Sequence, residues 1–141
     1  MLDTPEQAES AFYAAFEACD LASMGEVWQN DSRTRCIHPG GDLLQGYAAV
    51  MESWRAILAS AIPPVVRIRR LDRLRVDDVA IHLVEERIGP SGHRAELTRV
   101  LATNGYRRTA DGWRLFMHHA SLPLVRPGQQ SAKQTASPSL H

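Results

Sequence analysis

The two prolines at positions 63 and 64 divide this sequence into parts with different apolar spacing. Before them, apolar residues recur every three or four positions, as in an amphipathic helix. After them, apolar and polar residues alternate, as in a β-strand with one buried face. Proline cannot continue a helix, so the pair marks the end of the helical part. The chain is therefore predicted to be α+β, with helices before most of its strands.

The part before the prolines predicts three helices and one short strand. Asp3 or Thr4 can cap the first helix, Pro5 suits its first turn, and Asp20 can cap the second. The first two helices are close enough in sequence to form a hairpin. The predicted elements are a helix over 3–20, a helix over 20–28, a strand over 33–39, a loop over 40–46 and a helix over 47–62.

The part after the prolines predicts four strands joined by short turns, over 65–76, 79–88, 93–109 and 113–124. We expect a bulge near Leu71 and a tight turn at Asp77 and Asp78. Alternation in the second of these strands places Glu85 on one face, with Val79, Ile81 and Leu83, and Glu86 on the other, with Ala80, His82 and Val84. The resulting order, α-α-β-α-β-β-β-β, predicts a curved antiparallel sheet wrapped over the helices as a half-open cone, which can hold a pocket.

The length of 141 residues fits one domain, and 44% apolar residues are enough for a core. We assign residues 1–124 to that domain. The segment 125–141 is rich in Gln, Ser and Pro, and we expect a polar, flexible tail there. The apolar runs are shorter than the roughly 18 residues of a membrane span, and the first ten residues are too polar for a signal peptide.

Lys and Arg together number 16, and Asp and Glu together also number 16. A general nucleic-acid binder needs an excess of basic residues, so this balance argues against one. The two cysteines, Cys19 and Cys36, have neither the spacing of a CxxC pair nor that of a zinc finger. We interpret them as buried, reduced thiols and predict a cytoplasmic protein without nucleic-acid or membrane partners.

Four motifs together resemble the NTF2-like superfamily, and within it the SnoaL-like, ketosteroid isomerase-like branch with its SgcJ/EcaC-type group. They are W-x2-D-x6-HP from Trp28, GYAAV-x3-W from Gly46, ATN-x-Y from Ala102 and DGWRLFMHHAS from Asp111. The resemblance covers residues 5–123. It implies the same α+β cone and a homodimer. It leaves the activity open, because the superfamily includes isomerases, cyclases, dehydratases, hydrolases and proteins without catalysis.

His38 ends the short strand and is followed by Pro39 and two glycines. In the isomerase relatives a carboxylate base occupies the matching position. The resemblance therefore implies that His38 faces the pocket, where a histidine can take a proton at neutral pH. The alternative is a histidine that only bonds a loop carbonyl.

Two further candidates for acid–base chemistry lie on the predicted sheet. His118 and His119 are adjacent in a strand, so at most one can line a pocket, and the resemblance favours His119. Glu85 is in line with apolar residues, where it is either a general acid with a raised pKa or the partner of Arg87 or Arg99. The predicted catalytic set is His38, Glu85 and His119.

Aromatic and amide side chains provide candidates for ligand binding. The two helix tryptophans can pack in the core or form a ligand wall, and a strand amide and phenol can orient a ligand. The predicted binding set is Trp28, Trp54, Asn104, Tyr106 and Met117. A helix tyrosine donates to an oxyanion in the isomerases, but Tyr13 lies off the stripe formed by Phe12 and Phe16.

Two classes of function follow. The first is a cofactor-independent isomerase, cyclase or dehydratase acting on a small, largely apolar carbonyl compound, with His38 as base. The second is a non-catalytic module that binds a small ligand or forms dimers. We expect no cofactor, and no metal, since His38, Glu85 and His119 are far apart in sequence. Apolar residues on both faces of the strands favour a homodimer.

Overall fold

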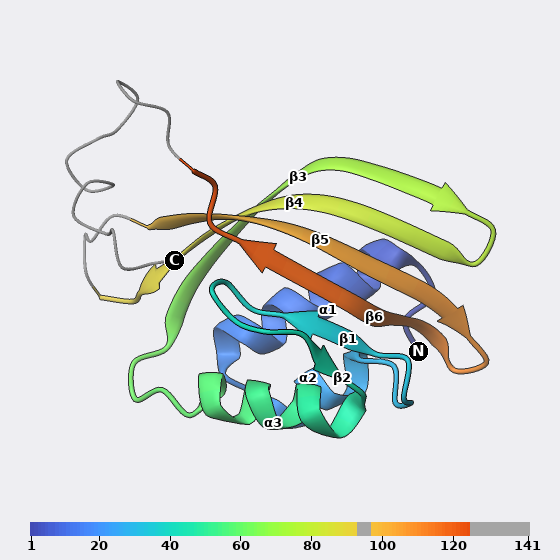
Figure 1. Cartoon of the computed structure of the whole chain (residues 1–141), viewed down its shortest axis with the longest axis horizontal. Coiled ribbons are helices and arrows are strands. Elements are labelled where there is room, and N and C mark those ends of the chain that lie inside the picture. Colours follow the sequence, from blue (N-terminus) through green and yellow to red (C-terminus); the bar gives the residue numbers. More distant parts are fainter. Residues whose placement is uncertain (93–96, 125–141) are drawn as a thin grey trace.

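The computed structural model describes residues 1–92 and 97–124. Three helices lie against one face of a curved six-stranded sheet, which confirms the predicted α+β cone (Figure 1). The helices are α1 (Pro5–Ala18), α2 (Leu21–Val27) and α3 (Tyr47–Leu58). The strands are β1 (Arg35–Ile37), β2 (Leu44–Gln45), β3 (Pro64–Val76), β4 (Val79–Pro90), β5 (Thr98–Thr109) and β6 (Gly112–Ser121). The predicted tail at 125–141 lies outside the described residues.

The helix ends follow the signals in the sequence. Thr4 caps α1 by accepting from the Gln7 amide, and Asp20 caps α2 by accepting from the Ser23 amide. Cys19 adopts a left-handed backbone, φ 53°, between the two helices, which turns the chain back into a hairpin. The third helix ends at Leu58, earlier than predicted, because the prolines follow a short non-helical connection rather than the helix itself.

The strand order in the sheet is β2-β1-β6-β5-β4-β3. The four long strands form the predicted antiparallel meander, whereas β1 pairs in parallel with β6. The expected loop over 40–46 contains the short strand β2, which pairs with β1. The predicted bulge in β3 is confirmed, since the register shifts between Arg70 and Asp72. These pairings place the carboxyl end of β1 beside the last part of β6.

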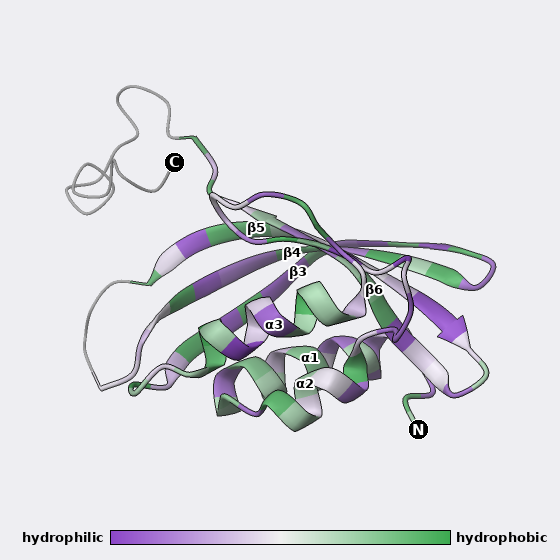
Figure 2. Cartoon of the chain, turned by 60° about the horizontal axis from the view of Figure 1, so that its bottom comes forward, coloured by the Kyte–Doolittle hydropathy of each residue, from purple (hydrophilic) through white to green (hydrophobic). Residues whose placement is uncertain are grey.

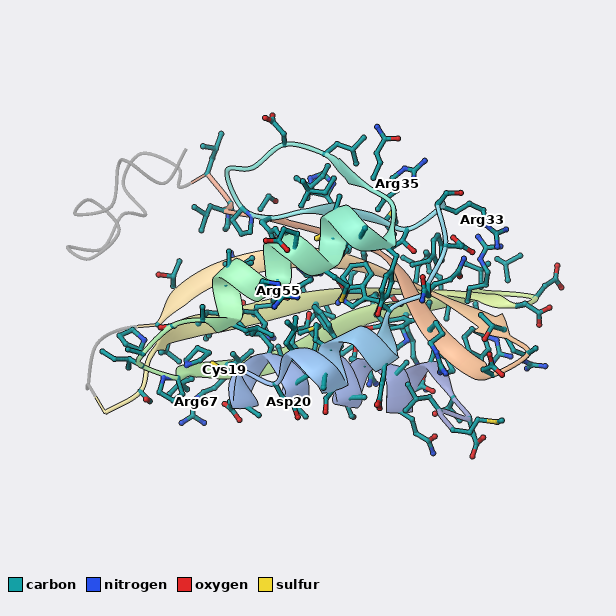
Figure 3. All side chains as sticks on the ribbon, turned by 90° about the horizontal axis from the view of Figure 1, so that it is seen from below. Cys19, Asp20, Arg33, Arg35, Arg55 and Arg67 are labelled. Atoms are coloured by element: carbon teal, nitrogen blue, oxygen red, sulfur yellow. The ribbon has the colours of Figure 1, made fainter. Side chains whose placement is uncertain are left out.

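The core lies between the helices and the concave face of the sheet (Figure 2). Its largest fully buried side chains include Trp28, Trp54, Trp113, Tyr106 and Phe12. Seen from below, side chains fill the space between the two layers, while the labelled Arg33 and Arg35 lie at the edge near β1 (Figure 3). No helix among the described residues is long and apolar enough to cross a membrane.

Candidate functional site

A cavity of about 520 Å³ opens between the helices and the concave face of the sheet. Its volume is in the range of small-molecule sites. Apolar side chains form most of its wall, from α1, α3 and the three strands β4, β5 and β6. They include Phe16, Trp54, Ile57, Ile88, Val100 and Leu122. Three titratable side chains also line it, namely His38, Glu86 and His118.

The histidine of β6 that lines the cavity is His118, not His119 as the resemblance had implied. His118 is buried, whereas His119 is exposed on the other side of the strand. Strict alternation would place His119 on the same face as Trp113 and Leu115. The pairing of β6 with β5 is not regular, however, because Gly105 pairs with Met117 whereas the next residue, Tyr106, pairs with Leu115. One extra residue in β6 reverses which side chains face inward after it.

The extra residue is Phe116, and a glycine on the neighbouring strand makes room for it. A Cβ atom at Gly105 would lie 3.0 Å from two ring atoms of Phe116. The Arg107 guanidinium stacks on the same ring, 4.6 Å from its centroid. An isolated glycine within a strand pattern is a recognised sign of a bulge. Gly105 was therefore the sequence signal for the bulge that turns His118 toward the cavity.

Glu86 is the carboxyl group of the cavity and is not among the site residues predicted from the sequence. It lies on the inner face of β4, and its side chain is 1% exposed. Burial raises its pKa to about 7, although a hydrogen bond from Tyr13 opposes that rise. The alternation in the sequence places Glu86 on the same face as Val84. Burying an unpaired carboxyl group there costs free energy, so its presence was a sequence signal for a functional site.

Glu86 and His118 are joined by hydrogen bonds through two buried side chains. The Tyr13 hydroxyl donates to Glu86 Oε2 at 2.5 Å, and Asn104 Nδ2 donates to the Tyr13 oxygen at 2.8 Å. Asn104 Oδ1 lies 2.5 Å from His118 Nδ1. Burial, with smaller contributions from His38 and His119, lowers the pKa of His118 to about 3, so its imidazole is neutral at physiological pH.

His38 lies at the cavity, as the resemblance had implied. Its Nε2 is 2.9 Å from Ser53 Oγ, and Ser53 Oγ donates to the Val50 carbonyl at 2.6 Å. Because the serine hydrogen is used for Val50, Nε2 of His38 is the donor and Nδ1 keeps a lone pair. The ring packs edge-on against Trp54, with centroids 5.0 Å apart. Burial lowers the pKa of His38, so this imidazole is also held neutral.

Glu85 lies on the convex face of the sheet and does not line the cavity. Arg99 donates to its Oε2 at 2.6 Å, and Arg69 and Arg87 lie 3.4 and 3.2 Å from its oxygens. Arg99, together with Arg69, lowers its pKa to about 2. Of the two interpretations of Glu85, the structure therefore favours the ion pair, and the expectation of a raised pKa is wrong.

The predicted ligand-binding residues divide between the cavity and its surroundings. Trp54 lines the cavity. Trp28 packs in the core against Phe12, and Met117 lies partly buried on the convex face. Asn104 and Tyr106 share the concave face of β5, as predicted, and Asn104 contacts the cavity through His118. The Tyr106 hydroxyl is buried without a hydrogen-bond partner among the described residues.

A second polar cluster lies where α1 meets β3 and β4. Glu9 accepts from Arg70 at 2.6 Å and lies 2.8 Å from His82 Nδ1. Burial alone would raise the pKa of Glu9, but hydrogen bonds with His82 and Arg70 hold it below its ordinary value. None of these three residues lines the cavity, so we interpret them as a structural attachment of α1 to the sheet. In the described part of the chain, no three metal-ligating side chains converge.

Residues 6–125 match the family model of the SnoaL-like domain. The chain belongs to the SnoaL-like domain family. The structure shares the NTF2-like fold with many solved proteins, which confirms the resemblance at that level. The SgcJ/EcaC-type subgroup stays a prediction.

Among the solved structures to which this chain is similar are two with 30% sequence identity or more. One, from Thiobacillus denitrificans, is provisionally named a calcium/calmodulin-dependent protein kinase type II association domain; it is 42% identical with a TM-score of 0.82, over 88% of this chain and 98% of that one. The other, from Streptomyces avermitilis, is provisionally named a dehydratase of the NTF2-like family. It is 30% identical with a TM-score of 0.76, over 86% of this chain and 100% of that one.

Among curated proteins, the chain is 23% identical to the F-box protein SKIP8 of Arabidopsis thaliana over 114 residues. That match covers 81% of this chain and 47% of the plant protein. The chain thus spans about half the length of the curated relative it matches.

Proposed function

We propose that this protein binds a small, largely apolar carbonyl compound in the cavity and catalyses a cofactor-independent proton transfer on it. The observation that carries the proposal is Glu86, a buried carboxyl group in the wall of an apolar cavity, beside His38 and His118. A carboxyl group in such surroundings can both take and give a proton near neutral pH. The reaction class is that of an isomerase, cyclase or dehydratase.

The residues around the cavity suit different parts of such a reaction. Glu86 accepts the proton released when a carbon–hydrogen bond next to the carbonyl breaks, and returns it to another atom of the ligand. His38, the base expected from the sequence, is the second group within the cavity and keeps its Nδ1 lone pair. Trp54 and the aliphatic side chains exclude water from the apolar body of the ligand. The dehydratase name of the 30% identical relative supports this class.

The proposal can be tested without the natural substrate by following exchange of carbon-bound hydrogen. The probe is 2-indanone, a compact apolar ketone, incubated in D2O with the protein at pH 7, and proton NMR follows the loss of its α-hydrogen signal. We expect exchange above the rate without protein, and loss of that excess in Glu86→Gln. Glu85→Gln is the matched control, because it changes the adjacent carboxyl group on the opposite face.

Binding is measured in the same samples from the fluorescence of the buried tryptophans. Binding with exchange that depends on Glu86 supports the enzyme. Saturable binding without exchange supports the alternative of a non-catalytic ligand-binding module. Absence of both binding and exchange, for 2-indanone and for the enone 2-cyclohexenone, contradicts the proposal.

We also propose that the protein forms a homodimer through the convex face of the sheet. Leu74 and Val76 on β3 are 55% and 70% exposed, and they pair with Ile81 and Val79 on β4. An exposed apolar sheet face of this kind is typical of an interface. The association-domain name of the 42% identical relative supports the proposal.

Sedimentation velocity tests the dimer directly. We expect twice the 15.7 kDa mass for the wild-type chain and the monomer mass for Leu74→Asp. Ile57→Asp, an exposed apolar residue on α3, is the matched control and leaves the dimer intact. A wild-type monomer at micromolar concentration contradicts the dimer.

A further inference from the structure

Glu86, Tyr13, Asn104 and His118 form one continuous hydrogen-bonded chain, which we call the buried polar chain. Its members come from four different elements, and all four are buried. Only the two ends, Glu86 and His118, line the cavity. The hydrogen bonds at the two ends use Oε2 of Glu86 and Nδ1 of His118, which leaves Oε1 and Nε2 for a ligand. Both ends of the chain are therefore available to the same ligand.

The hydrogen bonds of the chain all run in one direction when Glu86 is ionised. The carboxylate can only accept, so the Tyr13 hydroxyl donates to it and must itself accept from Asn104 Nδ2. The amide oxygen of Asn104 then faces His118, so Nδ1 of the imidazole has to carry the hydrogen. A neutral imidazole holds one ring hydrogen, which leaves Nε2 as an acceptor.

A proton bound at Oε2 of Glu86, the oxygen that faces Tyr13, would reverse this direction. The new carboxyl O–H donates to the Tyr13 oxygen, and the Tyr13 hydroxyl then donates toward Asn104. The side-chain amide of Asn104 then flips, so that its oxygen accepts from Tyr13 and its NH2 group donates to His118 Nδ1. The ring hydrogen of His118 then lies on Nε2. One proton has been added, to Glu86, and one ring hydrogen has changed nitrogen.

We propose that Tyr13 and Asn104 are positioning residues that couple the protonation of Glu86 to the ligand class accepted at His118. With Glu86 ionised, Nε2 accepts, and a hydroxyl or enol group gains a hydrogen bond there that the matching ketone cannot make, although the ketone still binds through its apolar body. With Glu86 protonated, Nε2 donates, and the corresponding carbonyl compound gains a hydrogen bond that it lacks in the ionised state, while a hydroxyl group can accept one there too. This inference rests on the proposed ligand-binding function, and it adds that the affinity of an alcohol or enol relative to the matching ketone depends on the state of one network.

Other titratable groups also surround the chain. Cys36 on β1 and Tyr106 on β5 lie near Glu86, and burial holds both neutral, with a pKa of about 12 for Cys36 and well above 10 for Tyr106. His38 and His119 lie near His118. Since His38 can gain a proton in acid, a pH effect is assigned to the chain only where it disappears in Glu86→Gln.

The first test uses the ligand-free protein. Nitrogen-15 NMR of the imidazole rings distinguishes hydrogen on Nδ1 from hydrogen on Nε2. We expect His118 to carry it on Nε2 at pH 5.5 and on Nδ1 at pH 8.5. Tyr13→Phe interrupts the chain and should make the His118 tautomer independent of pH, while Glu85→Gln should leave the wild-type change intact. A wild-type tautomer that stays the same across this range overturns the inference, whatever the ligand results.

The second test compares 2-indanol with 2-indanone, which share one shape and differ in donor and acceptor character. One matched hydrogen bond corresponds to about a tenfold change in affinity. We therefore expect the affinity ratio of alcohol to ketone to rise about tenfold from pH 5.5 to pH 8.5, and to stay constant in Tyr13→Phe and Glu86→Gln. Binding of both probes at a constant ratio in the wild type overturns the inference and leaves the proposed function standing. Binding of neither probe overturns the proposed function instead.

Discussion

Replacing Glu86 by Gln should change how stability depends on pH. Folding raises the pKa of this carboxyl group from 4.5 to about 7, mainly through burial. A raised carboxyl pKa means that the folded state binds the proton more tightly than the unfolded state. The stability from this group is therefore fully present below pH 4.5 and is lost as pH rises through about 7.

The size of the effect follows from the two pKa values. One pKa unit corresponds to about 1.4 kcal/mol, so the rise from 4.5 to about 7 gives roughly 3.5 kcal/mol in full, and about 2.5 kcal/mol of it falls between pH 5 and pH 8. Gln cannot ionise, yet its carbonyl can still accept from Tyr13. Glu86→Gln should therefore gain about 2.5 kcal/mol relative to the wild type over that range.

Urea unfolding at half-unit steps from pH 5 to pH 8 measures this difference. The difference between variants is needed because burial lowers the pKa values of His38 and His118, which makes their contribution rise with pH up to about 6.5. Glu85→Gln is the control: Glu85, with a pKa of about 2, is ionised throughout this range. Parallel curves for Glu86→Gln and the wild type would refute the assignment of a raised pKa to Glu86.

Three further outcomes follow from the packing. Gly105→Ala places a methyl group 3.0 Å from the Phe116 ring, so chemical unfolding should show a loss of about 1–3 kcal/mol and NMR a shift at His118; an unchanged spectrum contradicts the bulge. Arg70→Met leaves the buried Glu9 carboxylate with His82 as its partner. Urea unfolding should show that this variant is about 2 kcal/mol less stable than the wild type at pH 7, and that the difference is smaller at pH 4. Equal differences at the two pH values contradict an ionised Glu9. Trp54→Phe should weaken 2-indanone binding severalfold, whereas Trp28→Phe should lower the melting temperature and leave binding intact; the reverse result contradicts their placement.

The arrangement of elements was largely predictable because it depends on local signals. Periodicity, the caps Thr4 and Asp20, and the turn at Asp77 and Asp78 each act over a few residues. The length of the third helix and the strand β2 were not predicted. The strand β2 depends on the pairing of Leu44 with Cys36, which alternation within one segment does not reveal.

The site was predictable only in part, because two of its features depend on neighbouring strands. One inserted residue, Phe116, turns His118 instead of His119 toward the cavity. The sequence signal for this insertion is Gly105 on the adjacent strand. Glu85 and Glu86 are the same amino acid at adjacent positions, so residue type does not distinguish them. Their environments diverge because three arginines surround the first and Tyr13 of a distant helix contacts the second.

Carbon-13 NMR titration of the Glu86 carboxyl group tests the central claim most directly. With side-chain carboxyl labels and Glu86→Gln to assign the signal, we expect a midpoint near pH 7 and a shift of that midpoint when 2-indanone fills the cavity. A midpoint near 4.5 that does not respond to the ketone would show that Glu86 is an ordinary carboxylate, and would contradict a proton-transfer site in this cavity.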